Sequence, residues 1–221
     1  MRIVDGLRSE HRLIERVAGS LVTLAHSGAP REELGGALGD VCTFLEGYVD
    51  GYHHAKEEDL LLPALLAEQL PEAGPVAALR GEHAEHRAVA TALRAMARAC
   101  GAREPVESAL QVLATRYCAR LWEHIDKEDS VLFPEVETRL ALQAGRLNAA
   151  LDAFEARSED LASLAALGAS LVERFPPRTE LPGVMRGEGC VMCRHYGDTC
   201  QGIEREWWTE LEWETFWARP T

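Results

Sequence analysis

The sequence predicts an all-α protein: an up-down-up-down four-helix bundle with an additional C-terminal helix and a Cys/Trp-rich tail. Apolar residues recur at intervals of three and four up to about residue 175, and strand-type alternation is absent. Short connections that contain proline or glycine separate four helical stretches of about 20–35 residues, a pattern typical of an antiparallel bundle.

The first helix is expected over residues 3–25, where one face is apolar, and the segment "SGAP" ends it. The next three helices are expected to begin near Pro30, Pro75 and Pro105, because proline is tolerated at a first helical position. A fifth helical stretch, roughly 143–175, precedes the Pro/Gly-rich linker "FPPRTELPGVMRGEG". We therefore divide the chain into a bundle (1–141), a helical extension with its linker (142–178) and a C-terminal segment (179–221).

Composition excludes several classes of partner. The chain has 221 residues, 47% of them hydrophobic, and a net charge of −13. This charge argues against nucleic acid and against anionic membrane surfaces as partners. The longest apolar run, "LASLAALGASLV", is too short to span a bilayer, and "MRIVDGLRSEH" lacks the apolar centre of a signal peptide. We expect a cytoplasmic protein.

An internal repeat organises the chain. The segment "LRSEHRLIERVA" (7–18) is similar to "LRGEHAEHRAVA" (79–90), at an offset of 72 residues. The segment "HHAKEEDLLLP" (53–63) is similar to "HIDKEDSVLFP" (124–134), at an offset of 71. Each half therefore carries one His on its first helix and one His-x-x-x-Glu on its second.

The repeat also sets the register of the His-Glu pairs, because a spacing of four places both residues on one helical face. Relative to the matched prolines, His53 and Glu57 correspond to His124 and Glu128, and both pairs continue apolar stripes. His54 and Glu58 instead continue a more polar stripe, so we expect His53 and Glu57 to face inward.

These faces predict an interior that receives His11, His53, Glu57, His83, His124 and Glu128. Burying four imidazoles and two carboxylates without partners would be very costly, so they require shared protons or a metal. Such ligands suit iron, manganese or zinc. A single buried His bonded to Glu is the ordinary alternative, but the duplication, the core register and the matched prolines favour a metal. The two carboxylates would bridge two metal ions and the histidines would cap the ends.

These motifs resemble the hemerythrin-like, or HHE cation-binding, domain over roughly residues 5–140. The resemblance implies a four-helix bundle with a non-haem di-iron centre that binds or senses O₂, NO or peroxide, or that handles iron. It also implies that His11, His53, His83 and His124 are terminal ligands and that Glu57 and Glu128 are bridges.

The sequence departs from the oxygen-carrying hemerythrins at two points. Those carriers have a second His four residues along the third helix, where this chain has Arg87, and His86 lies one residue short of that position. The carriers also have Asp at a spacing of five where Glu128 stands. Both differences favour sensing, iron-handling or repair members over carriers.

Three functions remain open: a binding or sensing protein, an enzyme with peroxidase-like, catalase-like or NO-reducing activity, and a protein whose metal is only structural. Seven residues are candidates to surround the metal ligands, although solvent exposure or ordinary packing is the alternative for each. They are Glu10, Glu82, His54, Glu58, His86, Tyr52 and Tyr117.

The segment "CVMCRHYGDTC" contains Cys190, Cys193, His195 and Cys200. Thiolate and imidazole suit zinc, redox-active thiols are a second interpretation, and unliganded loop cysteines are a third. The Trp-rich end, "REWWTELEWETFW", is expected to dock on the bundle or to form a homodimer, because its apolar surface is large.

Overall fold

The structure is a computed structural model that describes residues 1–68, 70, 72, 76–101, 106–158, 160–182 and 184. Throughout these residues the secondary structure is helical and contains no strand. The predicted fold class, an all-α bundle, is confirmed. The Cys cluster and the Trp-rich end lie outside the described residues.

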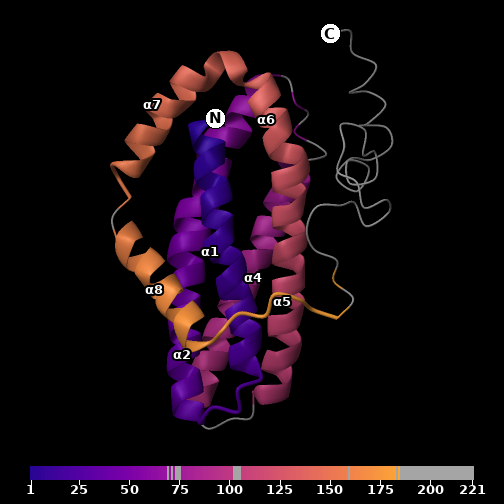
Figure 1. Ribbon diagram of the computed structural model, residues 1–221, viewed down its shortest axis with the longest axis vertical. Helices are drawn as coiled ribbons and strands as arrows, with labels where there is room; N and C mark the ends of the chain where they lie inside the picture. Colours follow the sequence, from indigo (N-terminus) through magenta and orange to yellow (C-terminus); the bar gives the residue numbers. More distant parts are fainter. Residues whose placement is uncertain are drawn as a thin grey trace.

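Four long helical rods form the bundle and run alternately along its axis (Figure 1). The first rod is α1 (Arg2–Ala25), and the third is α4 (Ala77–Gly101). The second is α2 (Arg31–Phe44), extended by η1 (Leu45–His54), η2 (Glu57–Leu61) and α3 (Leu62–Ala67). The fourth is α5 (Glu107–Lys127), extended by η4 (Glu128–Leu132) and α6 (Phe133–Arg139). Each rod contacts two neighbours, so that α1, α2, α4 and α5 close a ring.

The segments η1, η2 and η4 are π-helical, and they occur where the second and fourth rods carry the His-Glu pairs. Pro63 and Pro134 follow η2 and η4 at the start of α3 and α6. Proline removes one helical hydrogen bond, and its ring clashes with the carbonyl four residues earlier. A wider turn before each proline accommodates this defect, so the rod continues without a break.

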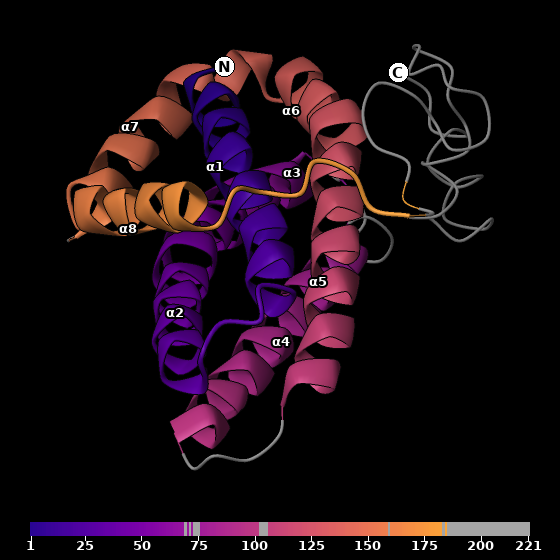
Figure 2. The same ribbon diagram turned by 60° about the horizontal axis from the view of Figure 1, so that its bottom comes forward.

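Two further helices pack against the bundle. A 3₁₀ turn, η5 (Ala141–Gln143), leads into α7 (Ala144–Glu155), and α8 (Leu161–Arg174) follows. Helix α8 crosses α1 and α2, whereas α7 contacts α1 and η2 (Figures 1 and 2). The single stretch expected at 143–175 is thus divided, and Asp160, at the start of α8, has a left-handed φ of 63°. Gly168 lets α8 approach closely, because a Cβ there would lie 2.5 Å from the Phe44 ring.

The segment after α8 crosses α1 at Gly19. The Arg178 amide donates a hydrogen bond to the Gly19 carbonyl at 3.1 Å, and the Thr23 hydroxyl donates one to the Pro176 carbonyl at 2.7 Å. A Cβ at Gly19 would lie 2.3 Å from the Arg178 carbonyl oxygen. Glycine is therefore required where the two backbones meet.

The core consists of two apolar clusters with a polar layer between them. Along α1, Leu7 belongs to one cluster and Ile14 to the other, and the buried His11 lies between them. Residues of α7 join the first cluster and residues of α8 join the second, so the extension shares the core of the bundle. Within the described part of the chain, no helix combines the length and apolarity that crossing a membrane requires.

Candidate metal centre

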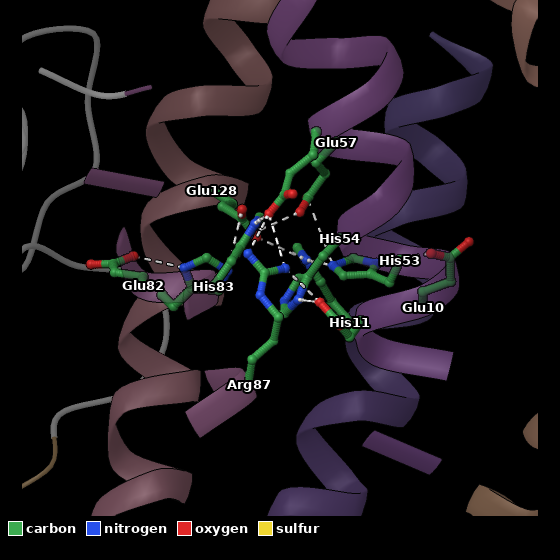
Figure 3. A network of polar contacts seen from close by, with 12 residues as sticks. Glu10, His11, His53, His54, Glu57, Glu82, His83, Arg87 and Glu128 are labelled. Carbon is green, nitrogen blue, oxygen red and sulfur yellow. Dashed lines mark hydrogen bonds and ion pairs between the residues drawn. The ribbon is translucent and has the colours of Figure 1, made fainter. Parts of the chain in front are cut away.

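The structure brings together the six residues that the sequence predicts as metal ligands. Their side chains converge from all four rods into the polar layer (Figure 3). Each is at most 2% exposed, although all six are titratable: His11, His53, Glu57, His83, His124 and Glu128.

The two central carboxylates each divide their oxygens between two histidines. Glu57 directs Oε1 toward His53 Nε2, at 3.7 Å, and Oε2 toward His83 Nε2, at 3.3 Å. Glu128 directs Oε2 toward His11 Nε2, at 3.2 Å, and Oε1 toward His124 Nε2, at 3.4 Å. One pair of oxygens thus faces the His11/His53 side and the other faces the His83/His124 side.

His11 Nε2 and His53 Nε2 share a hydrogen bond at 3.1 Å, whereas the other facing atoms have no hydrogen-bond partner within the described residues. Both oxygens of Glu57, both oxygens of Glu128 and the Nε2 atoms of His83 and His124 have no hydrogen-bond partner there. Buried carboxylates in this condition are strongly unfavourable unless a cation compensates them. Donor atoms within 4.8 Å of one another form one group of His11, His53, Glu57 and Glu128, and another of His83, His124 and Glu128. The donor set therefore fits two adjacent metal ions.

The opposite nitrogen of each histidine is held by a second carboxylate. The Nδ1 atoms of His11, His53, His83 and His124 donate to Asp129, Glu10, Glu58 and Glu82 respectively, at 2.9, 2.8, 2.7 and 2.7 Å. A carboxylate on Nδ1 fixes the ring orientation and leaves Nε2 directed inward, as is usual for histidines that bind metals. Both Glu10 and Glu82 thus lie beside the centre, Glu10 buried and Glu82 half-buried.

Two lysines extend this arrangement. Lys56 is 1% exposed, donates to Glu10 and lies 4.1 Å from the Tyr52 ring centroid. Lys127 donates to Glu82 at 3.2 Å.

Asp129, Lys56 and Lys127 are not among the residues that the sequence predicts to surround the centre. The signal that identifies them is the internal repeat, because Lys56 matches Lys127 and Glu58 matches Asp129 at the same offset of 71. The repeated residues therefore include the partners of the predicted ligands as well as the ligands.

The electrostatics of the cluster are set by burial and by these carboxylates. Burial opposes protonation of His11 and His83, but their carboxylate partners outweigh it and raise the pKa of His11 to about 10 and that of His83 to about 9. Burial and the charge of Glu128 raise the pKa of Glu57 above its ordinary value. Burial and nearby positive charges lower the pKa of His53 well below its ordinary value. The metal-free cluster thus shares protons that a metal would displace.

The expectation that His54 lies on a more polar stripe is wrong. His54 is 1% exposed, and its ring stacks on His83 with centroids 3.8 Å apart. The prediction of a polar stripe assumes the 3.6 residues per turn of an α-helix. Because η1 is π-helical, it has more than four residues in each turn. This wider turn lets His53 and His54 both point into the bundle.

Glu58 and His86 also make contacts with the clustered histidines. Glu58 accepts from His83 and also from the Arg87 guanidinium, at 3.2 Å. His86 is 6% exposed and meets His124 edge-on with centroids 4.9 Å apart, so it is buried beside the centre.

The two tyrosines lie on different sides of the centre. Tyr117 is buried and packs edge-on against His86, with centroids 5.6 Å apart. Tyr52 packs against Lys56 and Phe154. Tyr117 thus adjoins the His83/His124 side, whereas Tyr52 adjoins the Glu10 side.

The candidate site formed by Cys190, Cys193, His195 and Cys200 lies outside the described residues. Its interpretation as a zinc or redox site stays a prediction.

Comparison with known proteins agrees with this geometry at the level of the family. No curated protein and no solved structure gave a significant match. The family model described as Hemerythrin HHE cation binding domain matches residues 2–136, which is more than half of the chain and includes all six clustered residues. The chain therefore belongs to the hemerythrin HHE cation-binding domain family.

Proposed function

We propose that this chain binds two iron ions and uses them to bind or sense a small ligand, O₂, NO or peroxide, or to handle iron. One ion would be held by His11 and His53 and the other by His83 and His124, with Glu57 and Glu128 bridging both. Two carboxylate-bridged irons supply redox electrons and a coordination position for a small ligand.

The observation that carries this proposal is the division of each carboxylate between two histidine pairs. A single ion between one histidine pair would use only one oxygen of each glutamate. Here all four oxygens are buried and have no hydrogen-bond partner among the described residues, two on each side. Four oxygens and four Nε2 atoms supply four protein donors to each of two ions. Imidazole and carboxylate together suit iron.

The surroundings favour sensing or iron handling over oxygen carriage. Arg87, at the position where the carriers have their fifth histidine, is engaged by Asp50 at 2.7 Å and by Glu58 at 3.2 Å. A guanidinium stays protonated and is no metal ligand.

Metal analysis of anaerobically purified protein tests the metal content. After iron-replete expression we expect two irons per chain; one zinc and no iron would contradict the proposal. Glu57→Ala should remove both ions, because it removes one donor from each. Glu58→Ala is the matched control, and it should keep two irons at saturating iron because Glu58 contacts the outer nitrogen of His83 and the Arg87 guanidinium but none of the atoms proposed to bind the ions. Equal iron loss in the two variants would show that the assigned bridge is wrong.

Spectra recorded after adding O₂, peroxide and NO to the reduced protein separate the functions. Reversible binding supports the sensing protein. Catalytic turnover of peroxide or NO supports the enzyme alternative, and a spectrum that none of the three ligands changes supports a structural metal.

A further inference from the structure

A cavity of about 280 Å³ lies between the second rod and α4. Its lining includes the exposed Thr91 and Glu46 and the buried His54 and His86. Apolar side chains from η1 and α4 form part of its wall. The cavity therefore reaches two histidines whose rings pack against His83 and His124.

The two inner histidines present unused nitrogens. Neither ring nitrogen of His54 has a hydrogen-bond partner among the described residues, and the same is true of His86 Nδ1. The Oδ1 atom of Asp50 lies 3.5 Å from His54 Nδ1 but makes no hydrogen bond with it. Buried imidazoles are ordinarily bonded. Their unused nitrogens in the lining of this cavity indicate a ligand.

The polar groups that line the cavity suit a cation as its ligand. Its lining carries the carboxylates of Glu46 and Asp50 and one guanidinium, that of Arg87, a net charge of −1. These charges are already paired, because Arg87 bonds Asp50 and Glu58 and Glu46 bonds Arg94. The buried polar atoms of the lining that remain without a partner among the described residues are imidazole nitrogens, which bind first-row divalent cations.

One donor atom from each of His54, His86 and His124 lies within 4.8 Å of the others, which forms a third group capable of holding a metal. This group shares His124 with the inner group of His83, His124 and Glu128. The Nδ1 of His124 is bonded to Glu82, so only its Nε2 is available to either group. One nitrogen cannot bind two ions at once, so occupation of the two positions through His124 is mutually exclusive.

We propose that His54, His86 and His124 form a loading site for a first-row divalent cation that binds imidazole, such as Fe²⁺, Co²⁺ or Zn²⁺. The ion enters by the cavity, binds the three histidines, and then moves inward by keeping His124 and exchanging the other two for His83 and the bridging carboxylates. This role rests on the proposed two-metal function and extends it to the delivery of the second ion. It explains why two buried histidines keep unused nitrogens next to a centre whose two sides already have matched donors.

The rate of Co²⁺ uptake by metal-free protein tests the loading site. All chains carry Cys190→Ser, Cys193→Ser and Cys200→Ser, so that tail thiols take no metal. His54→Phe keeps a flat ring against His83 but removes the donor, and His86→Phe does the same beside His124. In each variant we expect uptake of one of the two ions to slow by roughly tenfold or more. Final stoichiometry should stay at two Co²⁺ per chain, and His26→Phe, at the exposed end of α1, should match the parent.

A second pair of variants tests the route without touching a histidine. Thr91→Trp fills the cavity mouth and should slow uptake. Ser158→Trp fills a different cavity, lined by Tyr52 and Phe154, and should leave uptake unchanged.

Unchanged uptake rates in both histidine variants would overturn the loading site, and so would a final stoichiometry of one, since the histidines would then be permanent ligands. Equal slowing by Thr91→Trp and Ser158→Trp would overturn the route. Parent protein that takes up no Co²⁺ would overturn the proposed function itself. Failure of the loading site alone would leave the parent with two ions.

Discussion

At the residue scale, the centre is built from carboxylate–histidine pairs that cross between rods. Glu10 on α1 holds His53 on the second rod, and its repeat counterpart Glu82 on α4 holds His124 on the fourth. Each glutamate also accepts from a lysine, so its charge is shared between an imidazole and an ammonium. Such partners orient a ligand and raise its basicity.

Replacing these partners should weaken the centre without removing a ligand. Glu10→Gln and Glu82→Gln keep the size of the side chain but lose the charge that holds Nδ1–H. We expect each to lower metal affinity by about 10–100-fold, as is typical for partners of metal-binding histidines. Competition with a chelator of known affinity measures this, with the exposed Glu85→Gln as control. If Glu10→Gln and Glu82→Gln lowered metal affinity no more than Glu85→Gln does, Glu10 and Glu82 would not support the metal-binding histidines.

The protonation of the metal-free cluster leads to a prediction about pH. The pKa values of about 10 for His11 and about 9 for His83 lie above 7, so both rings are protonated there without metal. A metal requires neutral imidazole, so binding should release about two protons from these rings at pH 7, and a further fraction from Glu57, whose pKa is raised to about 7. Affinity should therefore rise with pH up to about pH 10. Calorimetry in two buffers of different ionisation enthalpy counts these protons.

Asp129→Asn provides a matched comparison for this count. The hydrogen bond to Asp129 is the largest single cause that raises the pKa of His11. Its amide counterpart should lower that pKa and reduce the proton release, whereas the release from His83 should persist. A binding enthalpy that is independent of the buffer would contradict the prediction.

At the element scale, the π-helical segments determine which side chains the second and fourth rods bury. In η1 the wider turn places the adjacent His53 and His54 in the interior together. In η2 and η4 the wider turn precedes a proline and begins at Glu57 and Glu128 respectively. Both halves of the internal repeat therefore contain a π-helical turn together with the glutamate at which that turn begins.

The contact between α8 and the second rod can be tested at Gly168. A Cβ there would lie 2.5 Å from the Phe44 ring, so Gly168→Ala should lower the free energy of unfolding by about 1–3 kcal/mol, the usual cost of overpacking. Gly145→Ala is the control in α7, where a Cβ meets no atom within 4 Å. It should leave stability unchanged or raise it by up to about 1 kcal/mol, because alanine favours helix. Urea denaturation measures both, and equal effects would mean that α8 does not pack as described.

At the scale of the whole molecule, the polar layer separates two apolar clusters and holds two buried carboxylates that have no hydrogen-bond partner among the described residues. A ligand that binds only the folded chain stabilises it, by about 2.7 kcal/mol for each site at a free concentration one hundred times the dissociation constant. We therefore expect the unfolding temperature of metal-free protein to rise when Fe²⁺ is added anaerobically.

The double variant Glu57→Ala/Glu128→Ala separates this effect from general metal binding. It removes the buried charges and both bridges, so its unfolding temperature should not respond to Fe²⁺. Without metal, the double variant should be no less stable than the parent, because it removes two buried carboxylates that have no hydrogen-bond partner among the described residues. A metal response equal to that of the parent would place the stabilising ion elsewhere.

The sequence by itself determined the helical rods, their antiparallel order and the register of the His-Glu pairs. These depend on apolar periodicity and on an internal repeat, both of which are local properties that a single chain displays. The repeat was decisive, because it distinguished His53 and Glu57 from the adjacent His54 and Glu58.

The tertiary structure alone decided which carboxylate meets which histidine, and that His54 and His86 are buried. The sequence pattern assumes an α-helix, so it cannot show where a π turn brings one more residue to the interior. Contacts such as Asp129 with His11 join residues 118 positions apart, and no local pattern reports them. Their cause is the packing of four rods around one polar layer, which brings side chains from distant parts of the chain into contact.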